Sequence, residues 1–209
     1  MKKRCIIIGA SRKSDLSFLP ACLREDDYIV CADGGYSFAR TLGISPDLII
    51  GDFDSSDKPV DCGAEIIALP VKKDDTDTHY AVMECVKRGF DEFLLCGVSG
   101  GREDHSYSCL CSLKYLSDTG RKGCICDGDT VTRIIGKGVH SLAVKKGRGF
   151  GIFPFGCSSC TVTLKGFEYE ADRLELLSER PMGCSNRALT DAPLAEIHSG
   201  TAIIFEYPL

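Results

Sequence analysis

Four short clusters of charged residues carry most of the chemical information in this chain, and each follows a short apolar run. They are Asp33-Gly34-Gly35, Asp52-Phe53-Asp54, Asp74-Asp75-Thr76-Asp77 and Arg102-Glu103-Asp104-His105. The apolar runs read as β-strands, so the clusters should meet along one edge of a sheet, where open α/β folds bind ligands. Carboxylates gathered in one cleft repel each other unless a cation neutralises them. Mg²⁺, held through one or two carboxylates plus substrate phosphates, would do so.

Asp52 and Asp54 flank Phe53 directly after the apolar run Leu48–Gly51. Residues i and i+2 of an extended chain point the same way, so both carboxylates can face one ion. The same residues also suit a solvated turn, since Asp-Ser-Ser-Asp is ordinary turn chemistry. This motif alone leaves both interpretations open.

Two glycine-containing loops are placed to bind phosphate. Asp33-Gly34-Gly35 lies between a strand and a helix, where free N–H groups and the helix dipole favour an anion. The alternative is a tight turn that needs positive φ at a glycine. Residues 97–105 hold three glycines followed by Arg102, whose planar fork suits phosphate. Here the alternative is a surface pair between Arg102 and Asp104, and His105 could serve acid–base chemistry or simply cap a helix.

The third cluster, with Lys73 in front of it, lies at a predicted helix start. Acidic side chains are expected there for dipole reasons alone. Thr76 and Asp77 are candidate capping residues, and Gly89 is a natural helix stop. The joint placement of four clusters at strand ends therefore carries more weight than any single one.

The order of elements indicates an α/β domain over residues 1–127 and a β domain over residues 128–209. In the first, predicted strands alternate with helices, which favours a doubly wound, mainly parallel sheet. The strands are 4–9, 28–32, 48–51, 65–69, 93–98 and 124–126, and the helices are 16–23, 36–42, 76–88 and 105–116. The second shows short alternating segments typical of an antiparallel sandwich or barrel. They are 130–135, 141–144, 150–155, 160–164, 167–171 and 201–207, with a long excursion between 172 and 198.

Composition narrows the class of protein. The chain has 209 residues, 44% hydrophobic residues and a formal net charge of −5, which argues against wrapping of nucleic acid. No apolar stretch reaches the length of a membrane span, and the first one is too short for a signal peptide. We expect a cytoplasmic protein. Its 13 cysteines lie mostly in apolar runs, where a free thiol behaves as a small hydrophobe, although Cys157 and Cys160 have the spacing of a redox pair.

At these residues the chain resembles the thiamine pyrophosphokinase family. The matching blocks are Asp33-Gly34-Gly35, Gly51-Asp52-Phe53-Asp54-Ser55, Lys73-Asp74-x-Thr76-Asp77, Gly100-Gly101-Arg102-x-Asp104-His105 and Gly183-Cys184-Ser185-Asn186. The resemblance implies a doubly wound N-terminal domain, a C-terminal β-sandwich and a homodimer with sites at the subunit interface. It also implies transfer of the pyrophosphoryl group of ATP to the thiamine hydroxyl, giving thiamine diphosphate and AMP.

The resemblance assigns roles to individual residues. Asp52, Asp54 and Asp77 would hold Mg²⁺, and together with Arg102 and Asp104 they would form the catalytic set. The nucleotide would contact Asp33, Gly34, Gly35, Lys73, Thr76, Gly100, Gly101, Arg102, Asp104 and His105. Ser185 and Asn186 would help to form the thiamine pocket of the C-terminal domain. Either Asp77 or Asp104 could accept the hydroxyl proton.

Two departures from the family bear on the acceptor. Cys109 stands where many relatives carry an Asn, and the chain has no Trp to stack on thiamine, so Phe205, Tyr207 or an aliphatic residue would have to take that place. A non-catalytic thiamine- or nucleotide-binding regulator and a pyrophosphokinase for another primary alcohol are the competing hypotheses.

Overall fold

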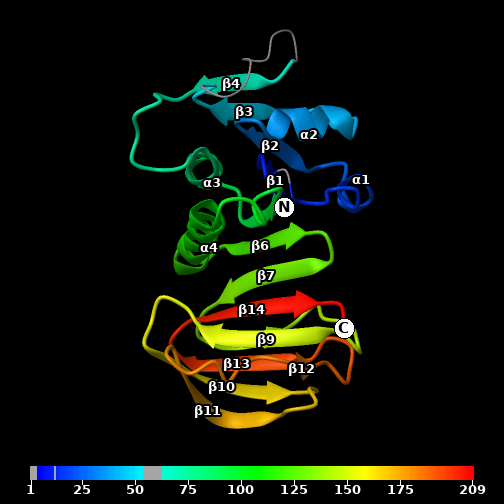
Figure 1. Cartoon of the computed structure of the whole chain (residues 1–209), viewed down its shortest axis with the longest axis vertical. Helices are drawn as coiled ribbons and strands as arrows, with labels where there is room; N and C mark the ends of the chain where they lie inside the picture. Colours follow the sequence, from blue (N-terminus) through cyan, green and yellow to red (C-terminus); the bar gives the residue numbers. More distant parts are fainter. Residues whose placement is uncertain (1–3, 12, 54–62) are drawn as a thin grey trace. The chain divides into compact units, whose positions relative to one another are not determined.

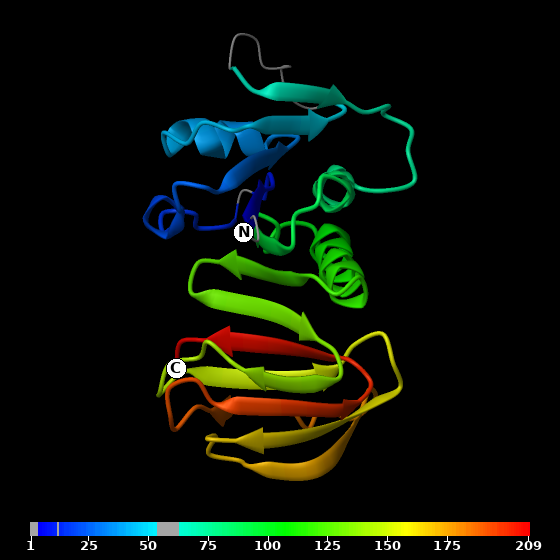
Figure 2. The same cartoon turned by 180° about the vertical axis from the view of Figure 1, so that it is seen from behind.

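The chain divides into two compact units, Met1–Gly128 and Asp129–Leu209 (Figures 1 and 2). The computed structural model describes residues 4–11, 13–53 and 63–209. No helix within these ranges is long and apolar enough to cross a membrane.

The first unit is an open, parallel α/β sheet. Its strands run in the order β6-β5-β1-β2-β3-β4, and every neighbouring pair among them is parallel. The strands are β1 Arg4–Ile8, β2 Tyr28–Ala32, β3 Leu48–Gly51, β4 Glu65–Ala68, β5 Glu92–Cys96 and β6 Lys122–Asp127. The helices are α1 Leu19–Cys22, α2 Gly35–Thr41, α3 Asp77–Lys87 and α4 Glu103–Asp118. Figure 1 shows α1 and α2 on one face of this sheet and α3 and α4 on the other. The predicted doubly wound fold is confirmed.

The sequence explains these elements well. Strands β1 and β5 are buried on both faces, which is why they read as continuous apolar runs. Thr76 caps α3 by accepting a hydrogen bond from the N–H of His79, and the chain leaves the helix at Gly89, whose φ is +87°. Helix α1 is shorter than predicted, spanning Leu19–Cys22, because Pro20 lies in its first turn.

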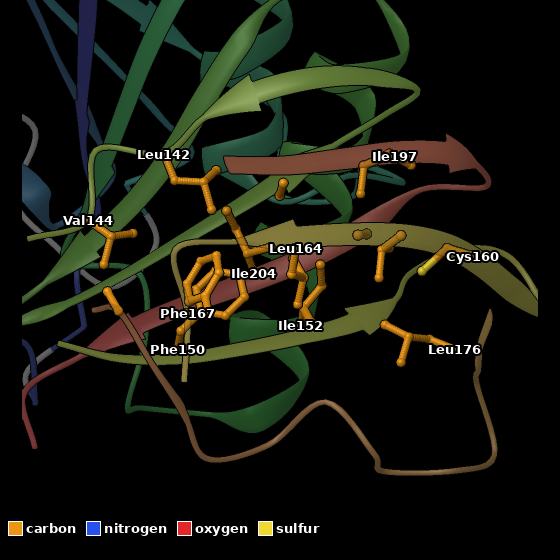
Figure 3. Close-up of a cluster of buried hydrophobic side chains, with 14 residues drawn as sticks. Leu142, Val144, Phe150, Ile152, Cys160, Leu164, Phe167, Leu176, Ile197 and Ile204 are labelled. Atoms are coloured by element: carbon orange, nitrogen blue, oxygen red, sulfur yellow. The ribbon is translucent and has the colours of Figure 1, made fainter. Parts of the chain in front are cut away.

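The second unit is antiparallel and contains two groups of strands. One has the order β12-β9-β14-β7, and the other is a separate four-stranded sheet with the order β11-β10-β13-β8. The strands are β7 Thr130–Ile135, β8 Gly138–Ser141, β9 Gly149–Pro154, β10 Ser159–Lys165, β11 Ala171–Leu177, β12 Asn186–Arg187, β13 Leu194–Ser199 and β14 Ala202–Tyr207. A buried cluster drawn from both groups forms the core, with the rings of Phe150 and Phe167 4.4 Å apart (Figure 3).

Three predictions for the second unit were wrong. The 141–144 strand lies earlier, as β8, and Leu142 and Val144 fill the core from outside it. The 167–171 strand is replaced by β11, and Phe167 makes only an isolated bridge to Ala188. The stretch from 172 to 198 is no long excursion, since it includes most of β11, all of β12 and most of β13. Strand β11 was missed because it is largely exposed, so its sequence lacks alternation of apolar and polar residues.

The described cysteines are free thiols. Burial raises the pKa of Cys109 to about 12 and that of Cys160 to about 11, so both resist conversion to the reactive thiolate. Cys157 exchanges hydrogen bonds with the backbone of Thr201. Most of the described thiols are buried or half-buried, as the sequence predicted, but Cys22, Cys111 and Cys184 are exposed.

Of the two glycines after β2, Gly35 is the one that close packing requires. Positive φ falls on Asp33, at +45°, whereas Gly34 has φ −61° and is the N-cap of α2. A Cβ on Gly35 would lie 2.0 Å from the carbonyl oxygen of Ile8, while one on Gly34 would lie 3.2 Å from the Cβ of Ala10. Gly35 therefore lets α2 approach the end of β1, and the expected positive φ at a glycine is not found at either position.

This difference predicts unequal effects of two neighbouring substitutions. Gly35→Ala should lower the free energy of unfolding by about 1–3 kcal/mol, because the backbone of β1 and α2 must separate. Gly34→Ala, the matched control, should cost at most about 1 kcal/mol. Denaturant titration of the purified variants measures both, and equal losses would contradict the close-packing explanation.

Candidate functional site

Asp33 and Asp52 lie at the carboxyl ends of adjacent strands. Asp33 follows β2 and donates its backbone N–H to the carbonyl oxygen of Ile50, 2.8 Å away on β3. A Cβ on Gly51 would lie 2.9 Å from the Cα of Asp33, so only glycine allows the two strand ends to come this close. Asp54, the predicted partner of Asp52, lies outside the described residues.

Lys73 links two of the predicted metal ligands. Its ammonium forms an ion pair with Asp52, and its Nζ lies 3.1 Å from Oδ1 of Asp77. The side chains of Lys73 and Asp52 are only 8% and 10% exposed, so these charges are largely shielded from water. Asp77 begins α3 and Asp52 follows β3. The two contacts of Lys73 therefore connect the carboxyl end of β3 to the start of α3.

Asp77 is in an unfavourable environment for a carboxylate. Burial raises its pKa, Lys73 opposes that rise, and the neighbouring charges of Asp52 and Asp33 add to it. Its Oδ1 is buried, and among the described residues it receives no hydrogen bond of suitable geometry despite the nearby ammonium. An oxygen left in this state is a ready ligand for a hard cation. No group of three His, Cys, Asp or Glu side chains within the described ranges is arranged to hold a metal ion.

Helix α3 brings this charged cluster to α4. Thr76 Oγ1 lies 3.2 Å from Ser108 Oγ, and one turn further along His79 Nδ1 lies 2.9 Å from Ser112 Oγ. Ser108 is four residues after Asp104, so the contact places the start of α3 beside the first turns of α4. The structure thus brings together the blocks around Asp33, Asp52, Asp77 and the start of α4, all within the first unit.

The glycine-rich loop after β5 is held by a residue that sequence reasoning missed. Asp127, the last residue of β6, accepts hydrogen bonds from Gly97 N at 2.6 Å and from Ser99 N at 2.9 Å. On the other side, Ser11 and Ser14 donate their hydroxyls to the carbonyl oxygen of Ser99. The sequence did contain a signal for this residue: Asp127 ends an apolar strand, the pattern by which the four charged clusters were identified.

Arg102 and Asp104 form a pair at the surface. Arg102 Nη2 lies 2.6 Å from Asp104 Oδ2, and the side chains are 71% and 65% exposed. This bond raises the pKa of Arg102 and lowers that of Asp104. His105 is also exposed. The surface pair named as the alternative is present, but exposure leaves both side chains able to turn to a ligand at little cost.

The two residues predicted to contact the acceptor lie in the second unit and differ in environment. Ser185 is exposed and has φ +60°. Asn186 is buried, accepts the backbone N–H groups of Tyr169 and Arg187 at 3.0 and 2.8 Å, and donates to Tyr169 O at 2.9 Å. Gly183 packs so tightly on β9 that a Cβ there would lie 1.6 Å from Ile152 O. The buried Asn186 side chain therefore holds the backbone of residues 183–187 in place, while the Ser185 side chain is exposed to solvent.

An open parallel sheet with carboxylates, a lysine and a glycine-rich loop at the carboxyl ends of its strands defines a class of enzyme that acts on phosphorylated small molecules. Residues 19–125, just over half of the chain, match the family profile described as "Thiamin pyrophosphokinase, catalytic domain". The chain belongs to the thiamin pyrophosphokinase family.

Individual relatives agree with this assignment. "Thiamin pyrophosphokinase 1" of Caenorhabditis elegans is 28% identical over 174 residues, which cover 78% of this chain and 70% of the relative. The fold matches that of thiamine pyrophosphokinase from Bacillus subtilis with a TM-score of 0.89 and 20% identity, over 99% of both chains. It also matches thiamin pyrophosphokinase from Candida albicans, with a TM-score of 0.82 and 16% identity over 99% of this chain and 89% of the other.

The environments of Ser185 and Asn186 predict separable effects. Asn186→Ala should lower the free energy of unfolding by about 1–3 kcal/mol, because it leaves backbone groups of Tyr169 and Arg187 without their partner. Ser185→Ala should leave stability nearly unchanged, since its side chain is exposed. Thermal unfolding of both variants checks this; equal stability of Asn186→Ala and wild type would contradict the structural role.

Proposed function

We propose that this protein is a Mg²⁺-dependent thiamine pyrophosphokinase, which transfers the pyrophosphoryl group of ATP to the hydroxyl of thiamine and releases AMP. The match of residues 19–125 to the family's catalytic domain carries the proposal. Those residues include Asp33 and Asp52, which follow strands, and Lys73, Asp77 and Arg102, which lie before or at the starts of helices α3 and α4. We further propose that it acts in the cytoplasm.

The described residues fit a magnesium ion shared with the nucleotide. Asp52 and Asp77 supply carboxylate oxygens, and the buried Oδ1 of Asp77 lacks a well-directed hydrogen bond. One or two carboxylates are the usual protein share of a Mg²⁺ site whose other ligands are phosphates and water. When bound, the ion would neutralise charge on the transferred phosphates. Asp54 remains a proposed third ligand.

The other residues act through position and charge. Lys73 is placed to exchange its carboxylate partners for phosphate oxygens, and Arg102 can turn its fork from Asp104 to the nucleotide. Burial raises the pKa of Asp77, whereas Arg102 holds that of Asp104 low. Either Asp77 or Asp104 could accept the proton of the thiamine hydroxyl. Coordination to the ion would make Asp77 a weaker base, and Asp104 could serve once Arg102 has turned away.

For the acceptor we propose the second unit, in a homodimer with sites at the subunit interface. Two half-buried aromatic rings, Phe205 and Tyr207, lie on β14. The Phe205 ring meets that of Phe153 at 6.2 Å, and the Tyr207 ring occupies the space that a Cβ on Gly149 would need. Either ring could take the place of the absent Trp against the cationic thiamine ring.

A product assay tests the proposal directly. Purified protein is incubated with ATP, Mg²⁺ and thiamine, and AMP is separated from ADP. Thiamine-dependent AMP in equal amount to thiamine diphosphate is the expected result. Formation of ADP in place of AMP would show that the enzyme transfers a single phosphoryl group, and it would contradict pyrophosphoryl transfer. Tight thiamine binding without either product would favour the non-catalytic regulator, and AMP formed only with a different alcohol would change the acceptor.

Asp77→Asn tests the metal assignment. Turnover should fall at least about 100-fold, because the amide replaces a charged oxygen that balances the ion. Asp118→Asn, which alters an exposed carboxylate paired with Lys114 on α4, is the matched control and should retain activity. Circular dichroism confirms that both variants are folded. Full activity in a folded Asp77→Asn variant would refute the assignment.

Lys73→Met tests whether the lysine occupies the place of the cation. Mn²⁺, used as a paramagnetic probe, is titrated into protein without nucleotide and the free ion is measured by electron paramagnetic resonance. Removing a positive charge 3.1 Å from Asp77 should tighten Mn²⁺ binding at least about tenfold. The neighbouring exposed Lys72, changed to Met, should shift it far less. Unchanged or weaker binding in Lys73→Met would show that the ion binds elsewhere.

A further inference from the structure

The loop that joins β5 to α4 is built around a single carboxylate. Asp127 Oδ1 accepts the N–H of Gly97 at 2.6 Å. Its Oδ2 accepts the N–H groups of Val98 and Ser99 at 3.3 and 2.9 Å, and the Ser99 hydroxyl at 2.5 Å. Gly97 has φ +67°, so the chain turns sharply and its successive N–H groups face the same side. Such a run of amides forms an anion-binding concavity, and here a side chain of the protein fills it.

A second set of contacts holds the same loop from the β1–α1 side. Ser11 donates its N–H to Gly97 O at 2.8 Å, and the hydroxyls of Ser11 and Ser14 donate to Ser99 O at 2.5 and 3.1 Å. A Cβ on Gly101 would lie 3.2 Å from the Ser11 hydroxyl. The loop is therefore fixed on both sides before any ligand binds.

Gly128, the residue after Asp127, also connects the end of β6 to the β1–α1 loop. Gly128 donates its N–H to the carbonyl oxygen of Asp15, which lies in the same segment as Ser11 and Ser14. Three chain segments thus meet at Asp127: the β1–α1 loop, the glycine-rich loop and the end of β6. Loss of the carboxylate would leave three backbone N–H groups and one hydroxyl without their acceptor at once.

We propose that Asp127 is a positioning residue that holds the glycine-rich loop in the shape that receives the phosphates of the nucleotide. This inference rests on the proposed function. Because Asp127 already occupies the amides of Gly97, Val98 and Ser99, the phosphates are left to the exposed Gly100 and Gly101 further along the loop. Asp127 touches no substrate itself, and its effect reaches the nucleotide through the backbone.

Asp127→Asn tests the proposal with two measurements. The amide can accept on one side only, and its NH₂ group faces N–H donors on the other, so the loop should loosen. Hydrogen exchange at Gly97, Val98 and Ser99 should accelerate at least about tenfold in ligand-free protein. The dissociation constant for α,β-methylene-ATP with Mg²⁺, an analogue whose α–β bond cannot be cleaved by pyrophosphoryl transfer, should rise at least about fivefold.

Asp47→Asn is the matched control. Asp47 also accepts a backbone N–H, that of Ile29 at 2.7 Å, but it lies at the opposite edge of the sheet, before β3. Its loss should affect stability and leave exchange in the 97–99 loop and nucleotide affinity unchanged. Ser99→Ala removes one of the four hydrogen bonds to Asp127 and should give an intermediate effect on both measurements. If Asp127→Asn does not fold, Ser99→Ala takes its place in the test.

The outcomes separate cleanly. Faster exchange with unchanged nucleotide affinity would reduce Asp127 to a purely structural role and overturn the proposal. Equal weakening of affinity by Asp47→Asn would overturn it too, since a general loss of stability would then explain both. Failure of the wild-type protein to bind the analogue would refute the proposed function itself, whereas a defect confined to Asp127→Asn and Ser99→Ala supports both.

Discussion

The balance of charge around Lys73 is the constraint on which the rest of this site depends. Asp33 and Asp52 follow strands that end at one edge, and Asp77 begins helix α3 beside them, so the fold brings the three together whether or not a ligand is present. Lys73 offsets their mutual repulsion, because it pairs with Asp52 and approaches Asp77. The lysine holds the two carboxylates close together, in the arrangement that a divalent cation and phosphates would later share.

In the glycine-rich loop, too, a charged side chain of the protein balances a group of like polarity, but here a carboxylate balances N–H donors. There the backbone amides are the uncompensated groups, and Asp127 is the internal counter-charge. The Lys73 side chain is largely buried and Asp127 is partly buried, whereas Arg102 and Asp104 meet at the exposed surface. The molecule thus combines a fixed frame, in which charges are already balanced, with exposed side chains that can reorganise around a ligand. Such pre-organisation reduces the ordering that binding must accomplish.

The sequence predicted the first unit well because most of its strands are apolar runs that alternate with helical segments and have clear stops. Every strand and helix there was found, with shifts of a few residues. The second unit was harder, since β11 is mostly exposed and β13 carries the small Ala195 at an inward position. Asn186 stays a predicted pocket residue, and its amide is in addition committed to the backbone of Tyr169. No local pattern reveals that commitment, because Tyr169 lies 17 residues away.

By itself the sequence determined the alternation of strand and helix, the positions of the charged clusters at strand ends and the family to which those blocks point. Local periodicity and turn chemistry are properties of neighbouring residues, so they can be read from one segment at a time. The tertiary structure decided which charges meet. Lys73 reaches Asp52 across 21 residues and Asp127 reaches Gly97 across 30, and these pairings exist only because parallel strands with crossover helices place distant strand ends side by side.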